Sequence, residues 1–144
     1  MFIAQEGGAG GISNVSLRGA ESNFTVVLVD GVQVNNPTDT RGGAFDFNSL
    51  ALASIERIEI VRGAQSAIYG SDALAGVINV ITRSGTETTE QTLVAELGER
   101  DFHRLAYSAS GSTARSGYAL TVQQKDSGEQ IKGSSFKSRE VSGR

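Results

Sequence analysis

Cysteine and tryptophan are absent from this 144-residue chain, and proline and histidine occur once each, as Pro37 and His103. The lack of cysteine excludes disulfide bonds and thiolate metal sites. A single histidine provides no imidazole cluster, so neither a resident metal nor any other cofactor is expected. The net charge of −3 argues against a nucleic-acid partner bound through a basic surface.

Long hydrophobic runs are also absent, and no stretch approaches the roughly 20 apolar residues of a membrane-spanning helix. This does not exclude a membrane, because a transmembrane strand needs only about 9–11 residues with alternate ones apolar. The N-terminus shows no signal-peptide pattern. Glycine is abundant, and the run Gly7 to Gly11 predicts a flexible loop whose spacing matches no phosphate-binding motif.

The first half of the chain contains several short strand patterns. Strands are expected at residues 12–18, 25–29, 55–61 and 76–82. Asp30-Gly31 is the strongest turn signal, because both residues tolerate the left-handed conformation. Asn48-Ser49 is expected to cap a helical turn over residues 50–54, and residues 66–69 are expected to form another turn.

No catalytic set emerges from the sequence. Glu56 and Glu59 are two carboxylates in one expected strand, but the two-residue period places them on opposite faces. No serine lies in a nucleophile-elbow motif, and the spacing around His103 suggests no triad. The sequence therefore predicts that the protein is not an enzyme, and His103 is interpreted as a residue at the rim of a barrel.

The second half has a different pattern. A stretch rich in Ser, Thr, Gly and Glu at residues 84–90 indicates a boundary, and three runs at 92–97, 102–109 and 118–123 then alternate apolar and polar residues. Such alternation is typical of a transmembrane barrel wall, and equally of a soluble sandwich with one apolar inner face. Residues 123–144 show no core-forming pattern.

Three motifs follow one another in a distinctive order: Ser16-Leu17-Arg18-Gly19, the segment 25–35 with Leu28-Val29-Asp30-Gly31 at its centre, and the glycine-punctuated segment 62–83. Together they resemble the plug domain of TonB-dependent outer-membrane receptors. The resemblance implies a mainly β fold, with a plug of a small mixed sheet and short helices at residues 1–85. Residues 86–144 would form about three antiparallel strands of a truncated barrel, which the family closes with about 22 strands.

The resemblance also implies a function. Family members reside in the bacterial outer membrane, contact its lipid, and take up a metal chelate such as cobalamin or a ferric siderophore when the TonB complex acts on the plug. The signal peptide, the first part of the plug and the TonB-contacting box are expected to be missing from this chain. The alternative is a soluble or surface-displayed all-β binding or adhesion module, and an enzyme ranks third.

Six residues are carried over from the family as site residues. Arg18 and Arg62 match arginines that pair with barrel-wall glutamates and lock the plug, or else they are solvated arginines at strand ends. Asn35, Asn36, Asp39 and Arg41, with the loop of residues 6–13, match loops that face the outside and touch ligand; as ordinary surface loops they would look much the same. Tyr69-Gly70 and Asn79 match packing or turn positions.

Overall fold

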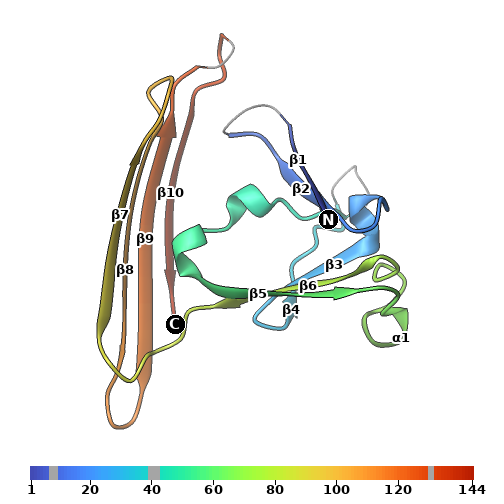
Figure 1. Ribbon diagram of the computed structural model, residues 1–144, viewed down its shortest axis with the longest axis horizontal. Coiled ribbons are helices and arrows are strands. Elements are labelled where there is room, and N and C mark those ends of the chain that lie inside the picture. Colours follow the sequence, from blue (N-terminus) through green and yellow to red (C-terminus); the bar gives the residue numbers. More distant parts are fainter. Residues whose placement is uncertain (7–9, 39–42, 130–131) are drawn as a thin grey trace. The chain divides into compact units, whose positions relative to one another are not determined.

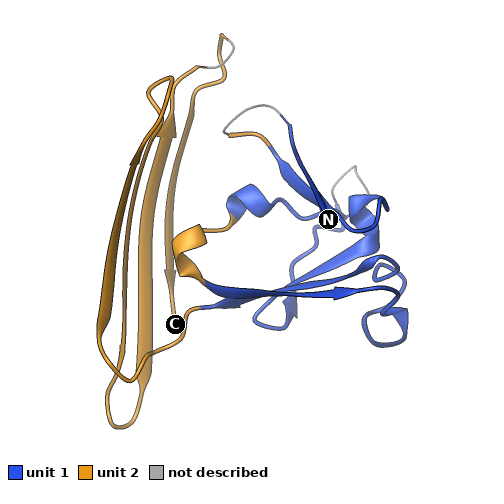
Figure 2. Cartoon of the chain, viewed as in Figure 1, with its two compact units in different colours: residues 1–6, 12–49, 56–82 blue, residues 7–11, 50–55, 83–144 orange. Residues whose placement is uncertain are grey.

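The computed structural model describes residues 1–6, 10–38, 43–129 and 132–144 (Figure 1). The chain forms two compact units (Figure 2). The first unit takes residues 1–6, 12–49 and 56–82, and the second takes residues 83–144 together with Gly10, Gly11 and residues 50–55. The chain passes to the second unit after Thr82, and the division into domains at residues 1–85 and 86–144 stays a prediction.

The first unit contains a four-stranded mixed sheet in the order β4-β3-β6-β5. Its strands are β3 (Thr25–Val29), β4 (Val32–Gln33), β5 (Ile55–Arg62) and β6 (Gly76–Thr82). β3 pairs with β6 in parallel and with β4 antiparallel, which confirms the expected mixed sheet. Because β3 and β6 are central, both of their faces are buried and both read as nearly continuous apolar runs. The core cluster consists of Val26, Leu28, Ala73 and Val77.

The turn between β3 and β4 forms as its sequence predicts. Asp30 and Gly31 have φ values of 50° and 82°, the two positive angles that a type I′ hairpin turn requires. The Asp30 carboxylate also accepts hydrogen bonds from the Thr82 backbone N–H at 2.9 Å and from Thr82 Oγ1 at 2.6 Å. Asp30 therefore closes one hairpin and fixes the last residue of β6.

A separate two-stranded antiparallel sheet joins β1 (Phe2–Gln5) and β2 (Ser13–Ser16). The strand predicted over residues 12–18 is shorter at its end, because Arg18 and Gly19 have positive φ values of 55° and 76°. The Ala20 N–H donates to the Leu17 carbonyl oxygen at 3.1 Å and closes this turn. The backbone therefore leaves the extended region two residues after β2 ends.

Short helical segments with fully described bounds connect the strands: η2 (Ser22–Phe24), η3 (Phe47–Ser49), η4 (Leu52–Ser54) and α1 (Ser66–Tyr69). α1 forms as predicted. The predicted Asn48-Ser49 cap is wrong, because these residues lie inside η3, and η4 begins after Ala51 without a side-chain cap. Asp46 takes the capping role, since its Oδ1 accepts the Asn48 N–H at 3.0 Å.

The second unit contains a four-stranded antiparallel sheet in the order β10-β9-β8-β7, drawn as four long neighbouring strands in Figure 1. Its members are β7 (Glu90–Leu97), β8 (His103–Ser112), β9 (Gly117–Ser127) and β10 (Phe136–Gly143). In the part of the chain that the structure describes, this is one strand more than the three predicted. The prediction that residues 123–144 lack a pattern is also wrong, because β9 continues to Ser127 and β10 follows.

The exposed face of this sheet is apolar and the buried face is polar, which we call inverted polarity because a water-soluble protein has the opposite arrangement. Leu93, Tyr107, Val122 and Val141 pair in register across all four strands and are 68%, 39%, 43% and 72% exposed. The alternate residues, which point to the opposite face, are small or polar and buried; they include Ser108, Ser110, Thr121 and Gln123. Within the described ranges, no helix combines the length and apolar character needed to cross a membrane.

Candidate functional site

The predicted ligand loop leaves the sheet through Asn35, whose side chain is used internally. Asn35 Oδ1 accepts the Val27 N–H at 2.7 Å, and Nδ2 donates to the carbonyl oxygens of Thr25 at 3.0 Å and Gly43 at 2.9 Å. These bonds satisfy the backbone of β3 on one side and the far end of the loop on the other. Asn35 therefore holds the loop against the sheet.

Asn36 lies on the exposed side of the same loop. Its Oδ1 accepts the Thr38 N–H at 3.1 Å and Thr38 Oγ1 at 2.7 Å, which stabilises a turn around Pro37. Asn36 is exposed on this turn, and its contact with a ligand stays a prediction. Asp39 and Arg41, the other two predicted contact residues, lie outside the described residues.

Asp46 anchors the end of this loop and is absent from the sequence prediction. Its Oδ1 accepts the N–H of Ser13, the first residue of β2, at 2.8 Å. Asp46 thus ties together the bases of both loops predicted to face ligand, residues 6–13 and the loop that begins at Asn35. The Asp-Phe-Asn-Ser pattern is a helix N-cap signal, but the Ser13 contact spans 33 residues and has no local signature.

The glycine-rich loop is closed at its base, where the Glu6 N–H donates to the Ile12 carbonyl oxygen at 3.0 Å. Gly10 lies against the ring of Phe136, the first residue of β10 in the second unit. A Cβ atom at Gly10 would come within 2.4 Å of that ring, so only glycine fits there. The Phe136 ring also receives the Lys125 ammonium at 5.5 Å from its centroid.

The two predicted lock arginines are both exposed and belong to the first unit. Arg18 follows the fully buried Leu17 and occupies the left-handed turn after β2, whereas Arg62 is the last residue of β5 and precedes Gly63. Among the described residues, neither guanidinium makes an ion pair or a side-chain hydrogen bond. Both are therefore available to a partner beyond those residues.

Gly76 brings the neighbourhoods of the two arginines together. A Cβ atom at this position would lie 2.3 Å from the Val61 carbonyl oxygen, 2.8 Å from Leu17 Cδ1 and 3.4 Å from Arg62 Cα. The start of β6 therefore packs between the residue that precedes Arg18 and the backbone of Arg62. A direct approach of the two guanidinium groups to each other stays a prediction.

The carboxylates Glu56 and Glu59 form a charged cluster on β5. Arg57 bridges them, with Nη1 at 2.7 Å from Glu56 Oε1 and Nε at 2.9 Å from Glu59 Oε1. The Arg57 hydrogen bond and then the bond from Asn79 Nδ2 lower the pKa of Glu59. Asn79 Oδ1 also accepts the Gly31 N–H at 3.3 Å, so this residue has the structural role predicted for it.

His103 has an acidic partner that sequence spacing did not indicate. Its Nε2 lies 3.0 Å from Asp126 Oδ2, because the register of β8 and β9 places the two residues directly opposite each other. His103 is the first residue of β8, and its place at the rim of a barrel stays a prediction. Cross-strand register, rather than proximity in the chain, creates this pair.

Comparison with known proteins identifies the first unit. Residues 1–77 match the TonB-dependent Receptor Plug Domain family. The vitamin B12 transporter BtuB of Vibrio cholerae is 41% identical over 109 residues, and that of Vibrio vulnificus is 42% identical over 109 residues. In both cases the match takes in 76% of this chain and 17% of the relative, so the chain spans about a sixth of the length of these relatives.

Solved structures agree with this assignment and extend it over both units. The siderophore receptor PirA from Pseudomonas aeruginosa matches 89% of this chain and 23% of its own, with a TM-score of 0.62 and 28% identity. PirA from Acinetobacter baumannii matches 87% of this chain and 20% of its own, with a TM-score of 0.62 and 27% identity. With its plug motifs, mixed sheet and adjoining antiparallel strands, the chain belongs to the TonB-dependent receptors.

Proposed function

We propose that this chain is part of a receptor that takes up a metal chelate across the bacterial outer membrane, with the first unit as the gating plug and the second as barrel wall. The inverted polarity of the second sheet carries this proposal. A row of exposed Leu93, Tyr107, Val122 and Val141 suits contact with lipid, whereas buried serine, threonine and glutamine suit the polar interior of a large barrel. A secreted soluble module would place these faces the other way round.

The ligand we propose first is cobalamin, with a ferric siderophore second. The 41% identity to a vitamin B12 transporter supports the first, and the 28% identity to a siderophore receptor supports the second. Energy for release would come from the TonB complex, as the family assignment implies. The two exposed arginines, Arg18 and Arg62, would hold the plug in the barrel through wall carboxylates until that force is applied.

Uptake by the full-length receptor tests the proposal. The receptor is produced in a strain that lacks its own corrinoid and siderophore receptors, and cells are given labelled cyanocobalamin or a labelled ferric siderophore. We expect uptake of one of them, and we expect it to vanish in the same strain without TonB. Equal accumulation with and without TonB, for both compounds, would contradict the proposed function.

A loop variant tests where the ligand is held. Changing Asn36, Asp39 and Arg41 together to alanine should weaken binding to whole cells without reducing the amount of receptor in the membrane, because loops tolerate changes that a core does not. Asn35 is left intact, since its amide supports β3. Arg115→Ala, in the turn between β8 and β9, is the matched control. Unchanged affinity in the triple variant would place the ligand site on other loops.

A further inference from the structure

The exposed apolar face of the second sheet ends in a cluster of charged and polar side chains. A row here means residues that lie opposite one another on neighbouring strands. The first row consists of Leu93, Tyr107, Val122 and Val141. The next row on the same face contains Gln124 and Arg139, and the row after it contains His103, Asp126 and Lys137. Successive rows are two residues apart along each strand, and side chains two residues apart point to the same face of a sheet. All of these residues therefore lie on one face. We call His103, Gln124, Asp126, Lys137 and Arg139 the terminal polar cluster.

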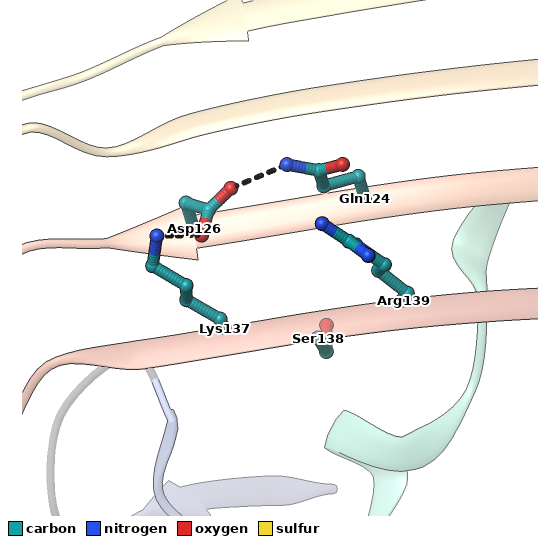
Figure 3. A pocket seen from close by; sticks show the side chains of 5 residues that line it. All are labelled: Gln124, Asp126, Lys137, Ser138 and Arg139. Atoms are coloured by element: carbon teal, nitrogen blue, oxygen red, sulfur yellow. Dashed lines mark hydrogen bonds and ion pairs between the residues drawn. The ribbon is translucent and has the colours of Figure 1, made fainter.

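The cluster is organised around the buried carboxylate of Asp126, whose side chain is 7% exposed. Oδ2 faces His103 Nε2 at 3.0 Å and accepts a hydrogen bond from Gln124 Nε2 at 2.8 Å, while Oδ1 lies 3.5 Å from Lys137 Nζ. Figure 3 shows Lys137 and Arg139 reaching from β10 towards β9. Together with Gln124, Asp126 and Ser138 they line a hollow at this end of the sheet.

Arg139 has an exposed guanidinium that, among the described residues, makes neither an ion pair nor a hydrogen bond. The nearby Lys137 is only partly engaged, because its side chain is 84% exposed and its Nζ lies 3.5 Å from Asp126 Oδ1. The cluster contains one carboxylate, two cationic side chains and a histidine, so it has a surplus of positive charge. The arginine is the group with unused donors, arranged in the fork that matches an oxyanion.

The position of the cluster suggests which anion it meets. The turn between β8 and β9 spans residues 113–116, whereas the connection between β9 and β10, next to the cluster, spans residues 128–135. Outer-membrane barrels have short periplasmic turns and longer external loops, so the cluster lies at the outer end of the apolar face. Cationic side chains are costly at the membrane midplane but well tolerated at its interface, where lipid headgroups begin.

We propose that Arg139, assisted by Lys137, binds the phosphate of a lipid headgroup in the outer leaflet. This proposal rests on the proposed function, because it takes the exposed face to be the lipid-facing wall of a barrel. The apolar row would contact the acyl chains, and the guanidinium would donate two parallel hydrogen bonds to phosphate oxygens. Asp126 and Gln124 hold the neighbouring side chains in place and leave the Arg139 donors to the lipid.

The experiment uses the purified full-length receptor, delipidated in detergent and examined by native mass spectrometry. The probes are phosphatidic acid, diacylglycerol with the same acyl chains, and inorganic phosphate. Arg139→Gln is the test variant, since Arg139 holds no described partner and its loss leaves the contacts of Asp126 intact. Arg115→Gln removes one exposed cation at the opposite end of the same sheet and is the matched control.

We expect the wild type and Arg115→Gln to retain phosphatidic acid in preference to diacylglycerol, and Arg139→Gln to bind it about tenfold more weakly. Equal retention of phosphatidic acid by Arg139→Gln and the wild type, in a receptor that still transports ligand, would overturn this inference alone. Full competition by inorganic phosphate would also overturn it, because the site would then not require a lipid. A wild-type receptor absent from the outer membrane would overturn both the inference and the proposed function.

Discussion

The Asn35 amide supports the central strand of the plug, which makes it a test of structure rather than of ligand contact. Its loss leaves the N–H of Val27, a residue only 2% exposed, without an acceptor. We therefore expect Asn35→Ala to lower the free energy of opening of β3 by about 1–3 kcal/mol. Native-state hydrogen exchange of the receptor, followed on the β3 amides, measures this.

Asn36→Ala is the control for that change. Asn36 is exposed and bonds only within its own turn, to Thr38, so its substitution should alter the stability of β3 by less than about 0.5 kcal/mol. If the β3 amides are equally protected from hydrogen exchange in the two variants, the hydrogen bonds of Asn35 contribute nothing measurable to the stability of β3.

Glu59 gives a pH-dependent test on β5. Its pKa is lowered chiefly by the Arg57 hydrogen bond and next by Asn79, so Arg57→Ala should raise the pKa towards the usual glutamate value and Asn79→Ala should raise it less. NMR titration of the Glu59 side-chain carboxyl carbon measures both shifts. A larger rise in Asn79→Ala than in Arg57→Ala would contradict this order of causes.

The same shift has a defined effect on stability. Because the folded state lowers the pKa of Glu59, the carboxylate stabilises that state above the unfolded pKa, and this contribution disappears as the pH falls through the lowered folded value. The group is exposed, so the contribution is small. We expect the acid limb of an unfolding profile to be slightly flatter in Glu59→Gln than in the wild type.

The glycines of the plug separate two physical effects, backbone strain and steric overlap. Gly31 and Gly76 both have positive φ, of 82° and 151°, but a Cβ atom at Gly31 meets nothing within 4 Å, whereas one at Gly76 lies 2.3 Å from the Val61 carbonyl oxygen. Gly31→Ala should therefore cost only the conformational strain of about 1–2 kcal/mol. Gly76→Ala should cost distinctly more, because β5 must move.

Protease resistance of the plug in the purified receptor compares these two variants. We expect Gly76→Ala to be cleaved faster within β5 and β6 than Gly31→Ala, at equal barrel content. Equal resistance would show that the sheet can shift at Gly76 without loss, and that the close packing of Leu17, Gly76 and Arg62 is not required.

Strands with a clear apolar pattern of their own could be predicted from the sequence. A strand that forms mainly by pairing with the adjacent strand could not. β3 and β6 are apolar runs next to turn signals, so their bounds followed from sequence. β10 has only Phe136 and Val141 as large apolar residues among polar, charged and small ones, and it pairs with β9 along its whole length. In the candidate site, Arg62 ends β5 as its sequence position indicates, but the contacts of Asp46 and of the His103–Asp126 pair join residues far apart in the chain.

The two units bury different kinds of surface, and this difference organises the whole molecule. The first has a compact apolar core around Val26, Leu28, Ala73 and Val77, whereas the second buries a small and polar face and exposes an apolar one. The first unit therefore has the character of a water-soluble domain. In the proposed receptor the second unit would contact lipid through its apolar face, and β7 and β10 are the edge strands of its described sheet.

The proposed lock by Arg18 and Arg62 can be tested on the whole receptor. Arg18 and Arg62 belong to the first unit, are exposed, and make no contact with a carboxylate among the described residues. In the full-length receptor we expect them to pair with carboxylates of the barrel wall, because a narrow polar interior favours paired charges over solvated ones. Replacing either by alanine should then leave a wall carboxylate unpaired and loosen the plug, with ligand affinity changed less.

Sensitivity of cells to a large antibiotic that does not normally cross the outer membrane measures that loosening. Arg18→Ala and Arg62→Ala should both increase it, and the double variant should show less than the sum of the two effects, because the same plug contact is lost. Arg115→Ala, which removes an exposed cation from a turn of the second sheet, should leave permeability unchanged. Unchanged permeability and plug stability in both single variants would mean that the two arginines are only solvated side chains next to glycine turns.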